Sequence, residues 1–162
     1  LNIIDIARLE KYKLEKLSKL NFVNLENVAL GAINSVKFLA GDIKISFFAD
    51  EEINVLANAQ MLETAIANIL TNAIKYSKTD RIDVLIKKAL ISVKDYGIGI
   101  EEKYLNKIFE KFYRIDKNRA RELGGSGLGL AITKEIVEIH GGKIKVETEP
   151  AKGCDFIITF PC

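Results

Sequence analysis

The amino-acid sequence predicts a two-layer α/β sandwich, with three main helices on one face of a mixed and mostly antiparallel sheet. Segments with helical periodicity are interspersed with pairs of short strand-like runs, an order typical of layered α/β folds. The 162 residues are 48% hydrophobic and 28% charged, the composition of one domain that buries a core. No stretch is apolar over the roughly 18 residues that a membrane span needs.

Four segments have the apolar spacing of amphipathic helices. The first, residues 1–17, is charged and begins without methionine, so we expect the chain to be part of a longer protein. The other three helices are predicted over residues 26–39, 59–76 and 128–139. Gly41 ends the second segment and Gly141-Gly142 ends the last, because glycine readily adopts the left-handed backbone that closes a helix.

Strands are predicted where apolar and polar residues alternate over short runs between turn residues. Residues 19–25 are expected to be extended, and a very tight turn near Lys88 should join two neighbouring strands. The polar, glycine-rich stretch 118–127 is expected to be a mobile loop, and residues 101–112 a mixed segment with short helical pieces. The predicted strands are residues 43–47, 53–56, 82–87, 90–94, 143–148 and 155–160.

Charge and cysteine content argue against a nucleic-acid interface and against a cysteine metal site. The formal net charge is only +2 and the basic residues are spread along the chain, whereas a nucleic-acid binder needs a dense cationic surface. Cys154 and Cys162 lack metal-ligand spacing, and we interpret them as incidental thiols.

A polar stripe on the predicted helix 59–76 has the chemistry of a metal and phosphate site. Asn68, Asn72 and Lys75 fall within a narrow arc at about 100° per residue. An asparagine oxygen is a hard ligand suited to Mg²⁺, and a nearby lysine supplies positive charge to phosphate oxygens. Taken alone, this spacing is commoner on a solvated helix face. The opposite arc suits a core and contains Leu62, Ile66, Ile69, Leu70 and Ala73.

Two glycine motifs support the site interpretation. Asp95 ends a predicted strand before Gly97 and Gly99; its carboxylate can accept from a purine amine, and the glycines let the backbone approach a flat ring. Alone, this motif is only a turn. The run 124–130 leads into helix 128–139 and can present backbone N–H groups to phosphates. It lacks the Gly-Lys-Ser/Thr of a Walker A loop and the third glycine of the dinucleotide fingerprint.

Together these motifs resemble the catalytic domain of sensor histidine kinases, which has the Bergerat ATP-binding fold shared with gyrase, the chaperone Hsp90 and MutL. Residues 68–77 resemble the N box of that family, 95–100 its first glycine box, 108–114 its F box and 125–132 its second glycine box. All four occur in the family's order, and the resemblance covers about residues 23–161.

The resemblance implies a role for each matching residue. Asn68, Lys75 and Arg114 would be catalytic, Asn72 would hold Mg²⁺, and the stretch 118–127 would be the ATP lid. The implied ATP contacts are Asn68, Asn72, Lys75, Tyr76, Asp95, Gly97, Gly99, Ile100, Arg114, Ser126, Gly127, Leu128, Gly129 and Leu130.

The resemblance also implies an activity and partners. The domain, residues 19–162, would transfer the γ-phosphoryl group of ATP to a histidine on a dimerisation hairpin. Residues 1–18 would be the tail of that hairpin, and the acceptor would lie outside this chain. Further expected partners are a response regulator and, in a membrane-anchored full-length protein, a second copy, although the fragment itself should be monomeric. The domain would be cytoplasmic, with no nucleic-acid partner.

Three residues need a separate interpretation. His140, the only histidine, precedes Gly141-Gly142 and is expected to cap its helix rather than accept phosphate. Phe109 and Phe112 fit either local core or the lid-ordering aromatics of the family. Cys154 stands where the family often has threonine or serine.

Two other functions compete with phosphotransfer. An ATP hydrolase of the same superfamily has a glutamate where Asn68 stands, and a neutral amide cannot abstract a proton from water. Glu63 is expected to lie on the far side of the helix. A degenerate nucleotide-binding module is the second alternative, and the presence of Asn72, Lys75, Asp95 and Arg114 argues against it.

Overall fold

The computed structural model of the chain describes residues 7, 11, 19–115 and 125–161. The predicted helix 1–17 lies outside the described residues apart from Ala7 and Lys11, which are both helical. Most of the predicted loop 118–127 also lies outside them. Within the described part of the chain, no helix has both the length and the apolar character needed to cross a membrane.

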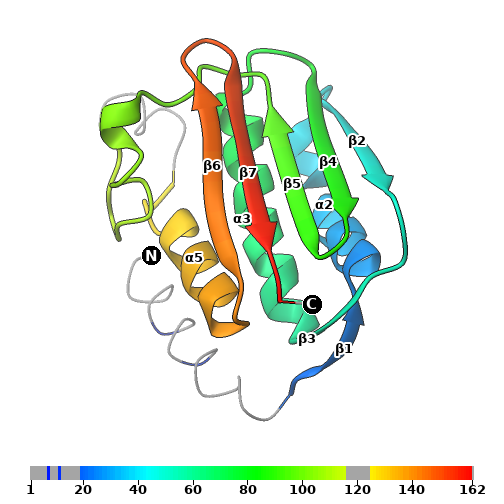
Figure 1. Cartoon of the computed structure of the whole chain (residues 1–162). Helices are drawn as coiled ribbons and strands as arrows, with labels where there is room; N and C mark the ends of the chain where they lie inside the picture. Colours follow the sequence, from blue (N-terminus) through cyan, green and yellow to red (C-terminus); the bar gives the residue numbers. More distant parts are fainter. Residues whose placement is uncertain (1–6, 8–10, 12–18, 116–124, 162) are drawn as a thin grey trace.

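Five strands form the main sheet in the order β2-β4-β5-β7-β6 (Figure 1). β2 lies parallel to β4, and the other neighbouring strands are antiparallel, so the predicted mixed and mostly antiparallel sheet is confirmed. Lys88, at φ 53°, lies in the two-residue turn between β4 and β5. The strands are β2 (Lys44–Ala49), β4 (Arg81–Lys87), β5 (Leu90–Asp95), β6 (Lys143–Glu149) and β7 (Gly153–Thr159).

A second, two-stranded ribbon pairs β1 (Asn21–Asn24) with β3 (Asn54–Ala57) in antiparallel register. The sequence predicted both the extended stretch 19–25 and a strand over residues 53–56, but not that the two pair with each other. Pairing was invisible in the local pattern because the whole of α2 (Leu25–Ala40) and β2 separates the two strands.

Helices α2, α3 (Ala59–Tyr76) and α5 (Gly129–Ile139) cover one face of the sheet (Figure 1), as predicted. α2 and α3 begin after Asn24 and Asn58. Each of these side chains accepts a hydrogen bond from the backbone N–H of the residue three positions later in the chain. α5 begins at Gly129 and not at Leu128, which precedes the helix as its N-cap. A short 3-10 helix, η1 (Glu102–Tyr104), is the helical piece of the mixed segment.

The central helix α3 supplies much of the core. Leu62, Ile66, Ile69 and Leu70 are at most 1% exposed, and burial of such a side chain stabilises a fold by about 1.5–3 kcal/mol. These side chains fix the rotation of α3 about its own axis. The polar stripe predicted on the other arc is therefore held in one orientation.

His140 ends α5 and connects it to α3. Its Nδ1 lies 2.7 Å from the Ile136 carbonyl oxygen, and its Nε2 accepts a hydrogen bond from the Asn58 N–H at 3.1 Å. A single tautomer, with the proton on Nδ1, satisfies both bonds. The predicted cap at the end of α5 is confirmed, and the ring is also engaged at the start of α3.

Replacing His140 by alanine is expected to lower the free energy of unfolding by about 1–3 kcal/mol, because it leaves a part-buried N–H of Asn58 without its acceptor. Urea unfolding at neutral pH measures this loss. His140→Asn should lose a similar amount of stability, since its shorter amide can keep the bond to Ile136 but not the bond to Asn58. Equal stability of the alanine variant and the wild type would show that the hydrogen bond between Asn58 and His140 does not contribute to the free energy of unfolding.

Candidate functional site

A cavity of ≈ 490 Å³ lies where the C-terminal half of α3, the end of β5 and the start of α5 meet. Most of the residues predicted to contact ATP line it, although they come from four separate segments of the chain. They are Asn68, Asn72, Lys75, Tyr76, Asp95, Gly99, Ile100, Arg114, Ser126, Gly127, Gly129 and Leu130. Gly97 and Leu128 are not among the lining residues.

Asp95 forms a buried acceptor in the lining of the cavity. The residue is 4% exposed, and its Oδ1 accepts hydrogen bonds from the N–H groups of Gly97 at 2.9 Å and Cys154 at 3.4 Å. Burial raises the pKa of the Asp95 carboxyl, and the two N–H donors oppose that shift. Oδ2 accepts no hydrogen bond from any described residue. The carboxylate therefore has one oxygen fixed by the backbone and one available to a ligand amine.

Glycines bring the backbone around Asp95 into close contact with its neighbours. A Cβ on Gly97 would collide with the carbonyl oxygen of Tyr76 at the end of α3. A Cβ on Gly153 would collide with the carbonyl oxygen of Asp95, and φ there is +95°. Gly97 thus lies behind the cavity wall, where it lets the end of α3 approach the turn that follows β5.

Two cations that line the cavity, Lys75 and Arg114, lie close to Gly125. A Cβ on that glycine would lie 3.1 Å from the Lys75 ammonium and 3.7 Å from the Arg114 guanidinium. Burial lowers the pKa of Lys75, and the positive charge of Arg114 lowers it further. An anion bound between the two side chains would relieve their repulsion, which makes the part of the cavity beside Gly125 suited to phosphate.

The two asparagines of α3 differ in what they already bind. The Asn68 amide donates to the Gly129 carbonyl oxygen at 3.2 Å, which leaves its own oxygen for other groups. Asn72 also lines the cavity, and its side chain makes no hydrogen bond to any described residue. Neutral amide oxygens beside a phosphate site fit Mg²⁺, which takes few protein ligands and completes its shell with phosphate oxygens and water.

The segment before α5 faces the same cavity. Gly127 has φ +75°, and its carbonyl oxygen accepts from the Phe112 N–H at 2.9 Å. The Ser126 hydroxyl accepts from the Leu128 N–H at 3.3 Å, and Leu128 is 2% exposed. Leu128 therefore anchors the start of α5 in the core while the neighbouring glycines face the cavity.

The two phenylalanines of the connecting segment have different surroundings. Phe109 packs edge-to-face on Phe156 with ring centroids 6.5 Å apart, which is a core contact. Phe112 is 46% exposed and has φ +66°, so it stands outside the core, beside Gly127. The core interpretation therefore holds for the first of the pair and not for the second.

Sequence reasoning missed the apolar wall of the cavity. Its residues come from separate segments of the chain, and aliphatic ones within the motif ranges, such as Ile98 and Ile108, were not selected because their side chains carry no group that suggests a ligand contact. Strand alternation could have predicted Cys154 and Phe156 on β7, because both face inward on the strand that pairs with β5, which ends at Asp95. The lining residues that were not predicted are Thr71, Ile98, Ile108, Tyr113, Ile115, Gly125, Cys154 and Phe156.

Glu63 lies away from the cavity. Its carboxylate carbon would be 2.8 Å from a Cβ on Gly31 of α2, so it lies at the contact between α2 and α3. The expectation that it occupies the far side of α3 is confirmed. Among the described lining residues, Asp95 is the only carboxylate.

Comparison with known proteins identifies the family. Residues 57–162 match the family model described as histidine kinase-, DNA gyrase B-, and HSP90-like ATPase. The chain is 36% identical to the sensor-like histidine kinase SenX3 of Mycolicibacterium smegmatis over 167 aligned residues, which cover 98% of this chain and 43% of that protein. It is 48% identical to the sensor protein kinase WalK of Staphylococcus saprophyticus over 102 residues, which cover 59% of this chain and 17% of that protein.

Solved structures agree with the sequence relatives. The fold is similar to that of a mycobacterial sensor histidine kinase, MprB, with a TM-score of 0.78 and 28% identity over 88% of this chain and 97% of that one. The catalytic domain of the histidine kinase ThkA matches with a TM-score of 0.73 and 26% identity over 88% of this chain and 95% of that domain. The chain therefore belongs to the histidine kinase-, DNA gyrase B- and HSP90-like ATPase family, as an ATP-binding domain of the sensor histidine kinase type.

Proposed function

We propose that this domain binds Mg·ATP and donates the γ-phosphoryl group to a histidine of another segment. The observation that carries the proposal is the set of charged groups lining one cavity, namely a buried carboxylate, Asp95, and two cations beside Gly125, Lys75 and Arg114. Adenine offers an amine to the carboxylate. A triphosphate offers negative charge to the two cations.

The described residues would position and neutralise the phosphates, which is most of what phosphoryl transfer requires of a protein. Lys75 and Arg114 would bind the phosphates, together with the N–H groups at the start of α5. Asn72, with Asn68 beside it, would hold Mg²⁺, which adds positive charge next to the phosphate oxygens when it is bound. An imidazole nitrogen of the acceptor would form the new N–P bond as the bond from phosphorus to the bridging oxygen breaks, and ADP leaves.

Transfer to histidine is favoured over hydrolysis by the position of the carboxylates. Activation of a water requires a base near the γ-phosphate, and among the described lining residues the only carboxylate is Asp95, which the proposal assigns to the adenine amine. Glu63, the other acidic residue of α3, packs against α2. The neutral Asn68 occupies the position of the base in hydrolytic relatives.

The remaining assignments concern the whole protein. The chain spans 43% of the length of SenX3 and 17% of that of WalK. We propose that the domain functions in a dimeric, membrane-anchored sensor kinase, on its cytoplasmic side, with residues 1–18 leading from a histidine-bearing hairpin. Its partners would be that hairpin and a response regulator.

The proposal is tested by adding the separately produced histidine-bearing hairpin to this domain with Mg·ATP. We expect acid-labile, alkali-stable phosphate on the hairpin and negligible release of free phosphate by the domain alone. His140→Asn should transfer phosphate as the wild type does, because both ring nitrogens of His140 serve structural hydrogen bonds. Steady ATP hydrolysis without the hairpin, or label on His140 itself, would contradict the proposal.

A further inference from the structure

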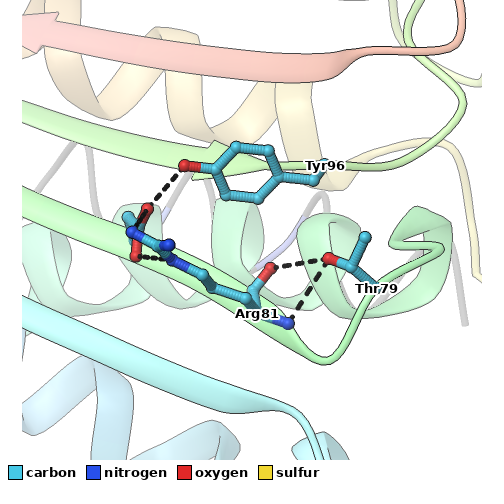
Figure 2. Close-up of polar contacts among 4 residues, drawn as sticks. Thr79, Arg81 and Tyr96 are labelled. Atoms are coloured by element: carbon cyan, nitrogen blue, oxygen red, sulfur yellow. Dashed lines mark hydrogen bonds and ion pairs between the residues drawn. The ribbon is translucent and has the colours of Figure 1, made fainter.

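A polar cluster lies on the outer face of the sheet, the face that the helices do not cover. It consists of Thr79, Arg81, Asp83 and Tyr96, which we call the outer latch (Figure 2). The Tyr96 hydroxyl donates to Asp83 Oδ2 at 2.6 Å, and Arg81 Nε donates to Asp83 Oδ1 at 2.8 Å. The second nitrogen of the Arg81 fork is 2.8 Å from Asp83 Oδ2, so the carboxylate is held by two partners.

Tyr96 directly follows Asp95, the acceptor in the cavity. Successive side chains of a strand point to opposite faces, which places the phenol outside the sheet while the carboxylate faces the cavity. The charges of Arg81 and Lys94 lie 5.6 Å and 5.4 Å from the centre of the Tyr96 ring. The ring therefore contacts β4 and β5 at once.

The turn that contains Tyr96 is closely packed on its inner side. The backbone of Gly97 abuts the Tyr76 carbonyl, and the backbone of Asp95 abuts Gly153. The Gly97 N–H donates to Asp95 Oδ1 at 2.9 Å, so the direction of the free Oδ2 depends on this three-residue turn. On the outer side, the described contacts of the turn are those of the Tyr96 side chain.

The latch also reaches the end of α3. Thr79 Oγ1 exchanges two hydrogen bonds of 3.4 Å with the backbone of Arg81, and the Ser77 hydroxyl donates to the Thr79 carbonyl oxygen at 3.1 Å. Ser77 immediately follows α3, whose last turn contains Lys75. Asp83 is the common acceptor, and the hydrogen bond from Arg81 lowers the pKa of its carboxyl, which keeps it charged at neutral pH.

We propose that Tyr96 is a positioning residue for adenine recognition, which through the outer latch holds the turn that aims Asp95 Oδ2 into the cavity. The inference rests on the proposed nucleotide binding. It assigns part of the base selectivity to a side chain on the opposite face of the sheet from the ligand.

The test compares Tyr96→Phe with the wild type for two probes, Mg·ADP and inorganic tripolyphosphate, by calorimetry. The variant removes one hydrogen bond and keeps the ring. We expect the Kd of ADP to rise about 3- to 10-fold, the effect of one lost hydrogen bond, and the Kd of tripolyphosphate to stay unchanged. Amide hydrogen exchange of Gly97 in the nucleotide-free protein should become faster. The Gly97 N–H donates to Asp95, and the turn that contains this bond would no longer be held by the hydrogen bond from the Tyr96 hydroxyl to Asp83.

Two further variants sharpen the test. Asp83→Leu, which removes the acceptor of the Tyr96 hydroxyl, should reproduce the effect, and adding Tyr96→Phe to it should change ADP affinity little further, because both substitutions break the bond between the two side chains. Glu147→Gln, which breaks the exposed ion pair with Lys145 on the same sheet face, should change neither affinity. Unchanged ADP affinity and unchanged Gly97 exchange, or an equal loss for both probes, would overturn the inference. If the wild type bound no nucleotide, the proposed function would fail, and the exchange of Gly97 would still decide whether the latch acts.

Discussion

Replacement of Asp95 by asparagine is expected to weaken the binding of ADP about 30-fold. The oxygen of the new amide can still accept from the N–H groups of Gly97 and Cys154, because Oδ1 already does so. The amide nitrogen would then occupy the position of Oδ2 and face the amine of adenine, donor against donor. Loss of a hydrogen bond to a charged group costs about 1.5–3 kcal/mol, which corresponds to a loss of affinity between about 10- and 160-fold. Calorimetry with ADP measures the change.

Guanosine nucleotides provide the opposite control, since guanine has an acceptor oxygen where adenine has its amine. The asparagine variant should gain affinity for GDP relative to ADP. If GDP competed with ADP equally well in the wild type, Asp95 would have no role in base selection.

The same substitution should leave the fold at least as stable. Burial raises the folded-state pKa of Asp95 above its unfolded value, so protonated Asp95 favours folding at low pH. That contribution is lost as the pH rises through the folded-state pKa. At neutral pH the buried charge opposes folding, and asparagine carries none. Urea unfolding at neutral pH should show equal or greater stability for the variant, with the difference disappearing below the ordinary carboxyl pKa.

Replacement of Asn72 by alanine is expected to abolish most of the Mg²⁺ dependence of ATP binding and to slow transfer to a supplied hairpin about 100-fold. The reason is that Asn72 lines the cavity and its side-chain amide makes no hydrogen bond to any described residue. Its oxygen can therefore coordinate a cation beside the phosphates. Calorimetry with a non-hydrolysable ATP analogue, with Mg²⁺ and with EDTA, separates the metal effect from the nucleotide effect.

Asn34→Ala is the matched control for this experiment. It makes the same chemical change on the exposed side of α2, far from the cavity lining, and should alter neither binding nor transfer. Equal affinity of Asn72→Ala and the wild type in the presence of Mg²⁺ would show that another group holds the metal.

The periodicity of the chain was sufficient to predict the three helices and the rotation of α3. Apolar residues such as Ile66 and Ile69 recur on one arc, and burial of that arc leaves Asn68, Asn72 and Lys75 on the other side. The rotation of α3 is a local feature, and local sequence determines it. The glycines after Asp95 were predicted to let the backbone approach a flat ring, whereas in the structure a Cβ on Gly97 or Gly99 would collide with the backbone of Tyr76 or Glu149.

Contacts between distant segments required the tertiary structure. The pairing of β1 with β3, the bond from Asn58 to His140 and the apolar wall formed in part by Ile108 and Phe156 join residues that no sequence period relates. The outer latch is of the same kind, since Asp83 and Tyr96 meet only through the register of β4 with β5. The sequence by itself determined which groups the site contains and which helix presents them. The packing of the sheet against three helices decided the shape of the cavity and the direction of Asp95, because both depend on long-range contacts that form only when the chain folds.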